Sequence, residues 1–184
     1  MPDLFSEISQ LLSRAPRLGD TRILAIDGPA GAGKSTLAGH LVKTLSPLGS
    51  VYIIHMDWIY AGWESALDNS LTEKLQAILN AVKNRAPIDL EIYNWYSGQF
   101  DQVRQIPIPE FLVIEGVGAA QKIIRDAGAI TIWMEIEPEV GMKRVLLRDG
   151  DAIAEQMQGW LKTQREYFHR DLTPESTDFS LSAT

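Results

Sequence analysis

A glycine-rich stretch that ends in lysine and serine carries the clearest chemical signal in this sequence. Residues 28–35 read Gly-Pro-Ala-Gly-Ala-Gly-Lys-Ser and fit the phosphate-binding pattern G-x-x-x-x-G-K-[ST]. Glycine allows backbone conformations that other residues resist, so the amides of such a loop can surround a phosphate group. The N-terminus of the helix that follows adds further N–H donors and a positive dipole end. The stretch therefore predicts that the chain binds a nucleoside triphosphate.

The residues of this motif have separate expected roles. Lys34 is expected to reach the β- and γ-phosphates, and Ser35 is expected to bind the Mg²⁺ that bridges them. ATP is the expected nucleotide. The sequence contains no readable motif for base recognition, so GTP stays open as the alternative. A glycine-rich turn with a chance lysine is the alternative, but the apolar run before the motif and the helical pattern after it favour phosphate binding. The predicted ATP-binding residues are Gly28, Ala30, Gly31, Ala32, Gly33, Lys34, Ser35 and Thr36.

Two carboxylates stand in places where the same chemistry would need them. Asp57 and Glu115 are each the first acid after an apolar run, at 51–54 and 111–114. One of them is expected to serve Mg²⁺ or its water shell, and the other to act as a catalytic base or to anchor an acceptor hydroxyl. The sequence does not say which acid has which role, and a surface acid or a helix cap is the alternative for either. The predicted metal ligands are Ser35, Asp57 and Glu115.

A pair of arginines gives the second electrostatic argument. Arg144 and Arg148 are four residues apart on a predicted helix, so they share a face and can point into one site. Two guanidinium groups there would stabilise the charge on a phosphoryl group during its transfer. Because Lys143 and Asp149 are close by, a solvated face with salt bridges is the alternative. A glycine after this helix predicts a hinge, so residues 144–152 are expected to form a lid-like element.

These residues need a scaffold that brings them together, and the hydrophobic pattern predicts one. Apolar runs at 21–26, 51–54, 111–114 and 130–134 are predicted strands, and helical patterns at 34–45, 67–82, 119–127, 138–148 and 153–168 alternate with them. Such alternation indicates a parallel sheet covered on both faces, with ligands beyond the carboxyl ends of the strands. The predicted fold is α/β, a three-layer P-loop NTPase fold with a central, mostly parallel sheet.

The predicted domain organisation is a single domain over residues 1–184. Residues 1–20 are expected to form a leading amphipathic helix, and a short strand is expected at 179–181. Between about 84 and 109 the periodicity lapses, which predicts a long loop region on the acceptor side, since long loops in compact domains are usually functional or mobile.

Composition excludes several classes of function. The 184 residues include no cysteine, which excludes disulfides and thiolate metal sites. The net charge of −7 argues against nucleic acid as a partner, because such binding depends on lysine and arginine. No signal pattern or apolar run of about 18 residues is present, so a cytoplasmic protein without membrane contact is expected.

Several short segments resemble a known family. Residues 26–36 resemble the P-loop of nucleoside and nucleoside monophosphate kinases, uridine kinases among them. Residues 56–60, Met-Asp-Trp-Ile-Tyr, are similar to the uridine kinase segment whose aspartate acts on the acceptor hydroxyl and whose tyrosine lines the site. Residues 113–116 and 144–149 are similar to that family's acid-glycine strand end and arginine-rich lid. Residues 87–94 are similar to its Pro-x-Tyr-Asp segment.

The resemblance implies a kinase that transfers the γ-phosphoryl group of ATP, with Mg²⁺, to a small-molecule acceptor, a nucleoside or nucleotide above all. The catalytic residues it implies are Lys34, Asp57, Arg144 and Arg148. The predicted acceptor-binding residues are Asp57, Tyr60, Tyr93, Trp95 and Glu115. The sequence departs from the family at Asn94, which stands in place of an acid. Trp58, Trp63 and Trp95 also crowd the acceptor region, where they either stack on a base or sugar or fill the core.

Two other classes of protein could use the same loop. A GTPase-type switch would need Asp-x-x-Gly and Asn-Lys-x-Asp motifs, and neither occurs in the chain. A non-catalytic ATP-binding regulatory or scaffold protein stays open as the alternative, and so does a homodimer.

Overall fold

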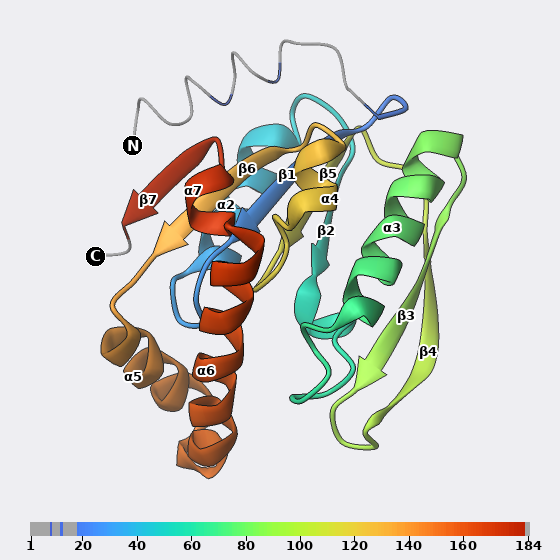
Figure 1. Ribbon diagram of the computed structural model, residues 1–184. Coiled ribbons are helices and arrows are strands. Elements are labelled where there is room, and N and C mark those ends of the chain that lie inside the picture. Colours follow the sequence, from blue (N-terminus) through green and yellow to red (C-terminus); the bar gives the residue numbers. More distant parts are fainter. Residues whose placement is uncertain (1–7, 9–11, 13–17, 183–184) are drawn as a thin grey trace.

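A five-stranded parallel sheet forms the centre of the protein (Figure 1). The computed structural model describes residues 8, 12 and 18–182. The strand order is β2-β5-β1-β6-β7, and each neighbouring pair is parallel. The strands are β1 (Arg22–Asp27), β2 (Val51–His55), β5 (Phe111–Glu115), β6 (Ile130–Glu135) and β7 (Phe179–Ser182). The predicted α/β class is therefore confirmed, and the short strand expected at 179–181 is the edge strand of this sheet.

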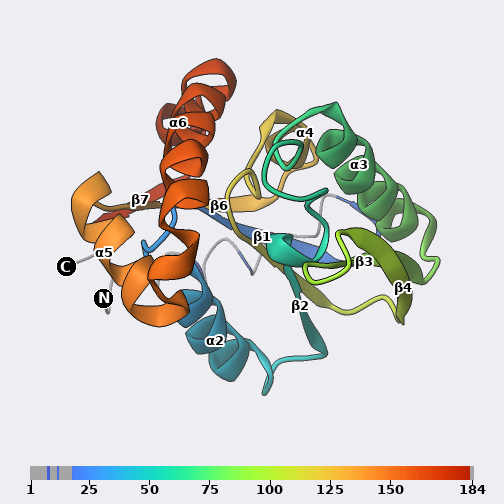
Figure 2. The same ribbon diagram turned by 90° about the horizontal axis from the view of Figure 1, so that it is seen from below.

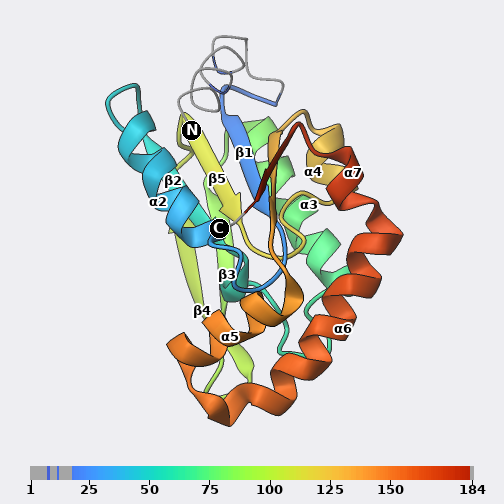
Figure 3. The same ribbon diagram turned by 90° about the vertical axis from the view of Figure 1, so that its left-hand side faces the viewer.

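Helices cover both faces of the sheet (Figures 2 and 3). On one face lies α2 (Lys34–Leu45), and on the other lie α3 (Asn69–Asn84), α4 (Lys122–Asp126) and α6 (Ala154–Asp171). The remaining helical elements are η1 (Met56–Trp58), α5 (Pro138–Asp149), η2 (Asp151–Ile153) and α7 (Thr173–Ser176). Figure 2 looks onto the carboxyl ends of the strands, where α5 and α6 lie to one side.

The central strand β1 shows why both faces are covered. Successive side chains of a strand point to opposite faces. Leu24 and Ile26 accordingly belong to the hydrophobic cluster that includes the buried leucines of α2, whereas Ile23 and Ala25 belong to the cluster that includes those of α3. The continuous apolar run Ile23 to Ile26 is therefore buried on both sides, as the sequence predicts.

The region from 84 to 109 is not the loop that the sequence led us to expect. It forms a hairpin of β3 (Ile88–Asn94) and β4 (Gln99–Ile106), a separate two-stranded antiparallel sheet beside α3 (Figure 1). Strand β3 begins with an alternation of buried and exposed residues, and Ile88 and Leu90 belong to the cluster that α3 helps to form. This period of two is typical of a half-buried strand, but most residues of β4 are exposed and polar, which hides the hairpin in the sequence.

Asn94 organises the turn of this hairpin. Its Oδ1 accepts hydrogen bonds from the amides of Tyr96 (2.9 Å) and Ser97 (3.3 Å), and its Nδ2 donates to Asp101 Oδ2 at 2.6 Å. Gly98 completes the turn with a φ of +70°. The residue that departs from the uridine kinase pattern therefore has a local structural role, because asparagine side chains stabilise turns in this way.

Two other predicted helices differ from the structure or lie partly outside it. The helix expected at 119–127 is limited to α4, because residues 116–121 form a loop with positive φ at Gly116 and Gly118. The leading helix expected in residues 1–20 lies mostly outside the described residues. Within it, Ile8 and Leu12 are buried in the cluster on the α2 side of the sheet. Among the helices described here, none has the length and apolar character needed to span a membrane.

Candidate active site

The glycine-rich loop, residues 28–36, connects the end of β1 to α2 at the carboxyl edge of the sheet. Gly28 has a φ of +140°, and a Cβ there would lie 2.2 Å from the carbonyl oxygen of Met134. Gly31 has a φ of +81°, and a Cβ there would lie 2.4 Å from the carbonyl oxygen of Gly141 in α5. Neither position can hold a side chain without movement of a neighbouring backbone. The loop is thus wrapped tightly between β6 and α5.

Lys34, the first residue of α2, points back across this loop. Its Nζ donates to the carbonyl oxygens of Gly28 (2.7 Å) and Pro29 (2.8 Å). Burial lowers the pKa of Lys34, and the negative charges of Asp27 and Glu115 oppose that shift. The side chain is 8% exposed and borders the cavity described below. A cation is therefore fixed at the base of the loop, where a bound polyphosphate would need one.

Asp27 fixes the start of the loop, and no role was predicted for it. This fully buried carboxylate accepts hydrogen bonds from the amides of Gly28 (2.7 Å), Gly118 (2.9 Å) and Ala120 (2.8 Å). Burial raises the pKa of Asp27 to about 6, while the three backbone donors oppose the rise. One side chain thus joins the glycine-rich loop to the loop that follows β5.

Glu115 lies beside the serine of the motif. The Ser35 hydroxyl donates to Glu115 Oε1 at 3.0 Å, and His55 Nδ1 makes a short hydrogen bond to the same oxygen. This bond raises the pKa of His55 above its ordinary value, and burial opposes the rise. The hydroxyl and the carboxylate are oxygen ligands, which suit Mg²⁺ when one or two protein groups and substrate phosphates share the ion. The donor set of this chain therefore fits the expected metal.

Asp57 lies in η1, directly after β2, and its position is fixed from the hairpin. The indole Nε1 of Trp95 donates to the backbone oxygen of Asp57 at 2.9 Å. Its carboxylate is open to solvent but surrounded by protein on most sides, and burial raises its pKa. The negative charge of Glu115 adds to this rise, whereas the positive charges of Lys34 and Arg148 oppose it. A carboxylate with a raised pKa is better matched to proton transfer than an ordinary aspartate.

The two predicted arginines reach the site from α5, which packs directly on the glycine-rich loop. A Cβ at Gly141 would lie 2.6 Å from the carbonyl oxygen of Ala30, so the two main chains are in contact there. Arg144, one turn further along, donates from Nη1 to the Gly31 carbonyl oxygen at 3.5 Å. Arg148 makes two hydrogen bonds with Asp149, at 2.6 and 2.7 Å. Both arginines line the cavity. Arg148 also forms an exposed ion pair with Asp149, as the alternative interpretation of this helix expected.

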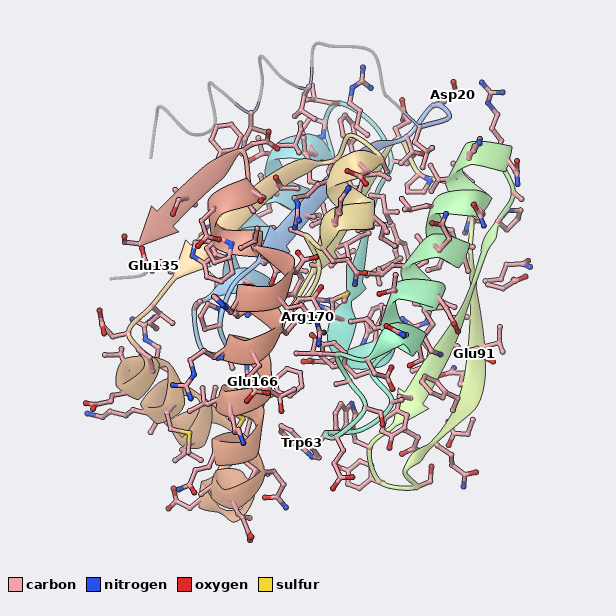
Figure 4. All side chains as sticks on the ribbon, viewed as in Figure 1. Asp20, Trp63, Glu91, Glu135, Glu166 and Arg170 are labelled. Atoms are coloured by element: carbon pink, nitrogen blue, oxygen red, sulfur yellow. The ribbon has the colours of Figure 1, made fainter. Side chains whose placement is uncertain are left out.

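A cavity of about 1030 Å³ brings these groups together. It is also lined by Trp58, Trp63, Trp95 and Trp160, here called the tryptophan wall. Trp63 packs edge-on against Trp95 of the hairpin and Trp160 of α6, with ring centroids 5.4 and 6.0 Å apart. Figure 4 shows Trp63 between α6 and the hairpin. The tryptophans are thus partly packed on one another and also border the cavity, so the two interpretations of their role are not exclusive.

Most of the predicted site residues line this one cavity. They are Ala30, Gly31, Gly33, Lys34, Ser35, Thr36, Asp57, Tyr60, Trp95, Glu115, Arg144 and Arg148. The Tyr60 hydroxyl is occupied, because it donates to the Val117 carbonyl oxygen at 2.7 Å. Gly28, Ala32 and Tyr93 do not line it. Tyr93 packs on Trp95 and Phe100, with ring centroids 5.1 Å from both. It therefore contacts the tryptophan wall through Trp95 without lining the cavity.

Known proteins resemble the chain in sequence and in structure. No protein-family model matches the chain. A uridine kinase from Schizosaccharomyces pombe is 24% identical over 193 aligned residues, which cover 92% of this chain and 42% of that protein. The chain thus spans less than half the length of this curated relative.

Two solved structures share the arrangement of elements. A protein from Bacillus stearothermophilus described as a possible uridine kinase superimposes with a TM-score of 0.65 and 20% identity, over 97% of this chain and 99% of that one. A protein from Silicibacter sp. TM1040, provisionally named a fructose transport system kinase, gives a TM-score of 0.70 and 18% identity, over 93% and 94%. The chain has the fold of the P-loop kinases. The resemblance to uridine kinase-like proteins noted in the sequence is thereby confirmed.

The P-loop kinase fold also explains which site residues sequence reasoning missed. Asp27 and His55 occupy the last positions of β1 and β2, and in this fold strand ends meet at the site. Asp27 could have been found by the rule that selected Asp57 and Glu115, and His55 by extending that rule from acids to any polar residue at a strand end. Gln164 of α6 could not, because its Oε1 accepts from the Ala30 amide at 3.1 Å across 134 residues of sequence. No local pattern indicates that contact.

Proposed function

We propose that this protein transfers the γ-phosphoryl group of ATP to a hydroxyl or phosphate group of a small-molecule acceptor, a nucleoside or nucleotide above all. The observation that carries the proposal is the convergence on one cavity of Lys34, the Ser35–Glu115 oxygen pair, Asp57 and the two arginines of α5. Phosphoryl transfer requires positioning and charge neutralisation rather than covalent participation by the protein, and this set of groups supplies both.

Each group has a role in the proposed step. The amides of the glycine-rich loop and Lys34 hold the polyphosphate, and Arg144 and Arg148 neutralise charge on the transferred group. For a hydroxyl acceptor, Asp57 accepts the proton as the oxygen forms its bond to the γ-phosphorus. The bond from that phosphorus to the β–γ bridging oxygen breaks at the same time, and ADP leaves. The raised pKa of Asp57 supports its role as base.

Ser35 and Glu115 would hold Mg²⁺, as their oxygen donors fit that ion, and Asp57 is close enough in the cavity to serve its water shell. The ion supplies charge neutralisation between the phosphates when it is bound. Glu115 is the better candidate for a direct metal ligand because its carboxylate contacts the Ser35 hydroxyl, the other proposed ligand. Asp57 is therefore the better candidate for the base.

ADP production with Mg²⁺-ATP and a panel of acceptors tests the proposal. The panel should contain nucleosides, nucleoside monophosphates and other small alcohols. We expect one class to stimulate turnover, and Asp57→Asn to lower kcat by about 10²–10⁴-fold with ADP affinity unchanged, because the variant cannot accept the proton. Asp89→Asn, at an exposed position of β3, is the matched control and should leave kcat unchanged.

Two outcomes would contradict the proposal in different ways. If Asp57→Asn weakened ATP binding and left kcat intact, the assignment of the base would be wrong. If no acceptor stimulated turnover while Mg²⁺-ADP still bound, a non-catalytic ATP-binding regulatory or scaffold protein would be the better conclusion.

A further inference from the structure

His55 is a polar residue next to the site that the proposed reaction does not use. It is the last residue of β2, and the register of the parallel strands pairs it with Glu115, the last residue of β5. Its Nδ1 is hydrogen-bonded to Glu115 Oε1, the same oxygen that accepts from Ser35. A carboxylate offers only lone pairs, so this bond requires the proton of the ring on Nδ1. His55 therefore restrains the orientation of the carboxylate without lining the cavity itself.

His55 also contacts the tryptophan wall. Its ring packs edge-on against Trp58, with centroids 4.7 Å apart and planes at 71°. Trp58 borders the cavity and is held in turn by Arg104 of β4, whose guanidinium lies 4.6 Å from the centre of the indole ring. His55 does not line the cavity itself. It thus stands between a side chain that an acceptor would touch and the carboxylate that would serve the metal.

We propose that His55 is a positioning residue that holds the Glu115 carboxylate against Ser35 for metal binding and connects this carboxylate to Trp58 on the acceptor side. The inference rests on the proposed function for the identity of the metal. Two donors on one carboxylate oxygen restrict its rotation, and only 6% of the Glu115 side chain is exposed. Residues that orient a metal ligand in this way contribute strongly to metal affinity even though they do not touch the ion.

The first experiment measures how much Mg²⁺ strengthens ADP binding. Calorimetry of ADP binding in EDTA and in Mg²⁺ gives this gain for each variant. We expect His55→Ala to bind ADP normally in EDTA. The increase in ADP affinity that Mg²⁺ causes should be about tenfold smaller in this variant than in wild type, as is usual when such an orienting group is removed. His55→Asn keeps a donor close to the position of Nδ1 and should restore most of the gain. His40→Ala removes an exposed histidine of α2 and should have no effect.

The second experiment tests the connection to Trp58. Trp58→Leu should lower the Mg²⁺-dependent gain by less than His55→Ala does, and it should lower the gain no further when His55→Ala is already present. Such non-additivity identifies residues that act through each other. Circular dichroism and thermal unfolding of each variant show whether the fold is kept, and the EDTA titration shows whether the glycine-rich loop still binds ADP.

Equal Mg²⁺-dependent gains in wild type and His55→Ala would overturn the inference and leave the proposed kinase reaction intact. Additive effects of the two substitutions would remove the connection to Trp58. A wild-type protein whose gain depends on His55, but which phosphorylates no acceptor, would support the inference and contradict the proposed reaction. The two proposals can therefore fail independently.

Discussion

The glycine-rich loop contributes one continuous stretch of backbone to the cavity, whereas the tryptophan wall contributes side chains from three separate parts of the chain. Trp58 and Trp63 follow β2, Trp95 comes from the hairpin turn and Trp160 from α6. Substitutions on the two sides should therefore have separable effects. Changes in the loop should act on nucleotide binding and on the reaction itself. Changes in the wall should act mainly on the acceptor, with Trp58 as the exception through its contact with His55.

Among the substitutions that compare the two sides of the cavity, the largest effect is expected on the loop side, from Lys34→Ala. Its ammonium group is the cation fixed at the base of the loop, so its loss should lower kcat/KM by about 10²–10³-fold, the usual cost of removing one preorganised charge stabiliser. Lys43→Ala, on the exposed side of the same helix, should leave the activity unchanged. A steady-state assay of ADP formation measures both, and similar losses in the two variants would contradict a specific role for Lys34.

The next effect distinguishes two glycines close together in sequence. Gly31→Ala places a side chain at a φ of +81° and 2.4 Å from the Gly141 carbonyl oxygen. The backbone conformation alone should cost about 1–2 kcal/mol of unfolding free energy, and ADP affinity should fall as the loop shifts. Gly39→Ala in α2 meets no atom within 4 Å and should instead stabilise the protein by about 0.5–1 kcal/mol. Urea denaturation of both variants checks the opposite signs.

On the acceptor side, Trp63→Leu should have a smaller effect of a different kind. Loss of one stacking surface should raise the KM of a ring-bearing acceptor about tenfold, because such contacts contribute about 1–3 kcal/mol. ADP affinity should stay the same, since the ring contacts of Trp63 are with Trp95 and Trp160 of the wall. A matching loss of ADP affinity would show that the two sides of the cavity are not separable.

The smallest expected effect is a displacement of the pH profile. Burial raises the pKa of Asp57, and a base must be ionised to act, so kcat should rise with pH through this raised pKa and then level off. The midpoint should lie above the ordinary aspartate value. Asp57→Asn should remove this acidic limb from its residual activity. A wild-type midpoint at the ordinary aspartate value would contradict the role of Asp57 as a base with a raised pKa.

The central sheet and the loop side could be predicted from the sequence because their signals are local. Continuous apolar runs identified the strands, and the spacing from Gly28 to Ser35 identified the loop. The hairpin was missed because β4 gains little burial and therefore shows little apolar pattern. A strand of this kind forms because it pairs with β3, and the periodicity of its own sequence does not reveal that pairing.

The candidate site was predictable to the extent that the strand-end rule applies. It selected Asp57 and Glu115, and the structure brings both to the cavity. The contact of His55 with Glu115 joins residues 60 positions apart, and it depends on which strands become neighbours in the sheet. Two of the three amides that Asp27 binds, those of Gly118 and Ala120, are also distant in sequence. Partners of this kind are fixed by topology and register, so composition and spacing do not reveal them.

Because Gly31 and Gly141 bring two main chains into direct contact, α5 cannot slide along the glycine-rich loop without first separating from it. The arginines of this helix are therefore held beside the glycine-rich loop, which is the proposed nucleotide-binding side of the cavity. A chimera that exchanges only the hairpin, residues 88–106, for the matching segment of another protein would leave the central sheet, α3 and α5 in place. New alcohols could then be tried on an unchanged phosphate donor.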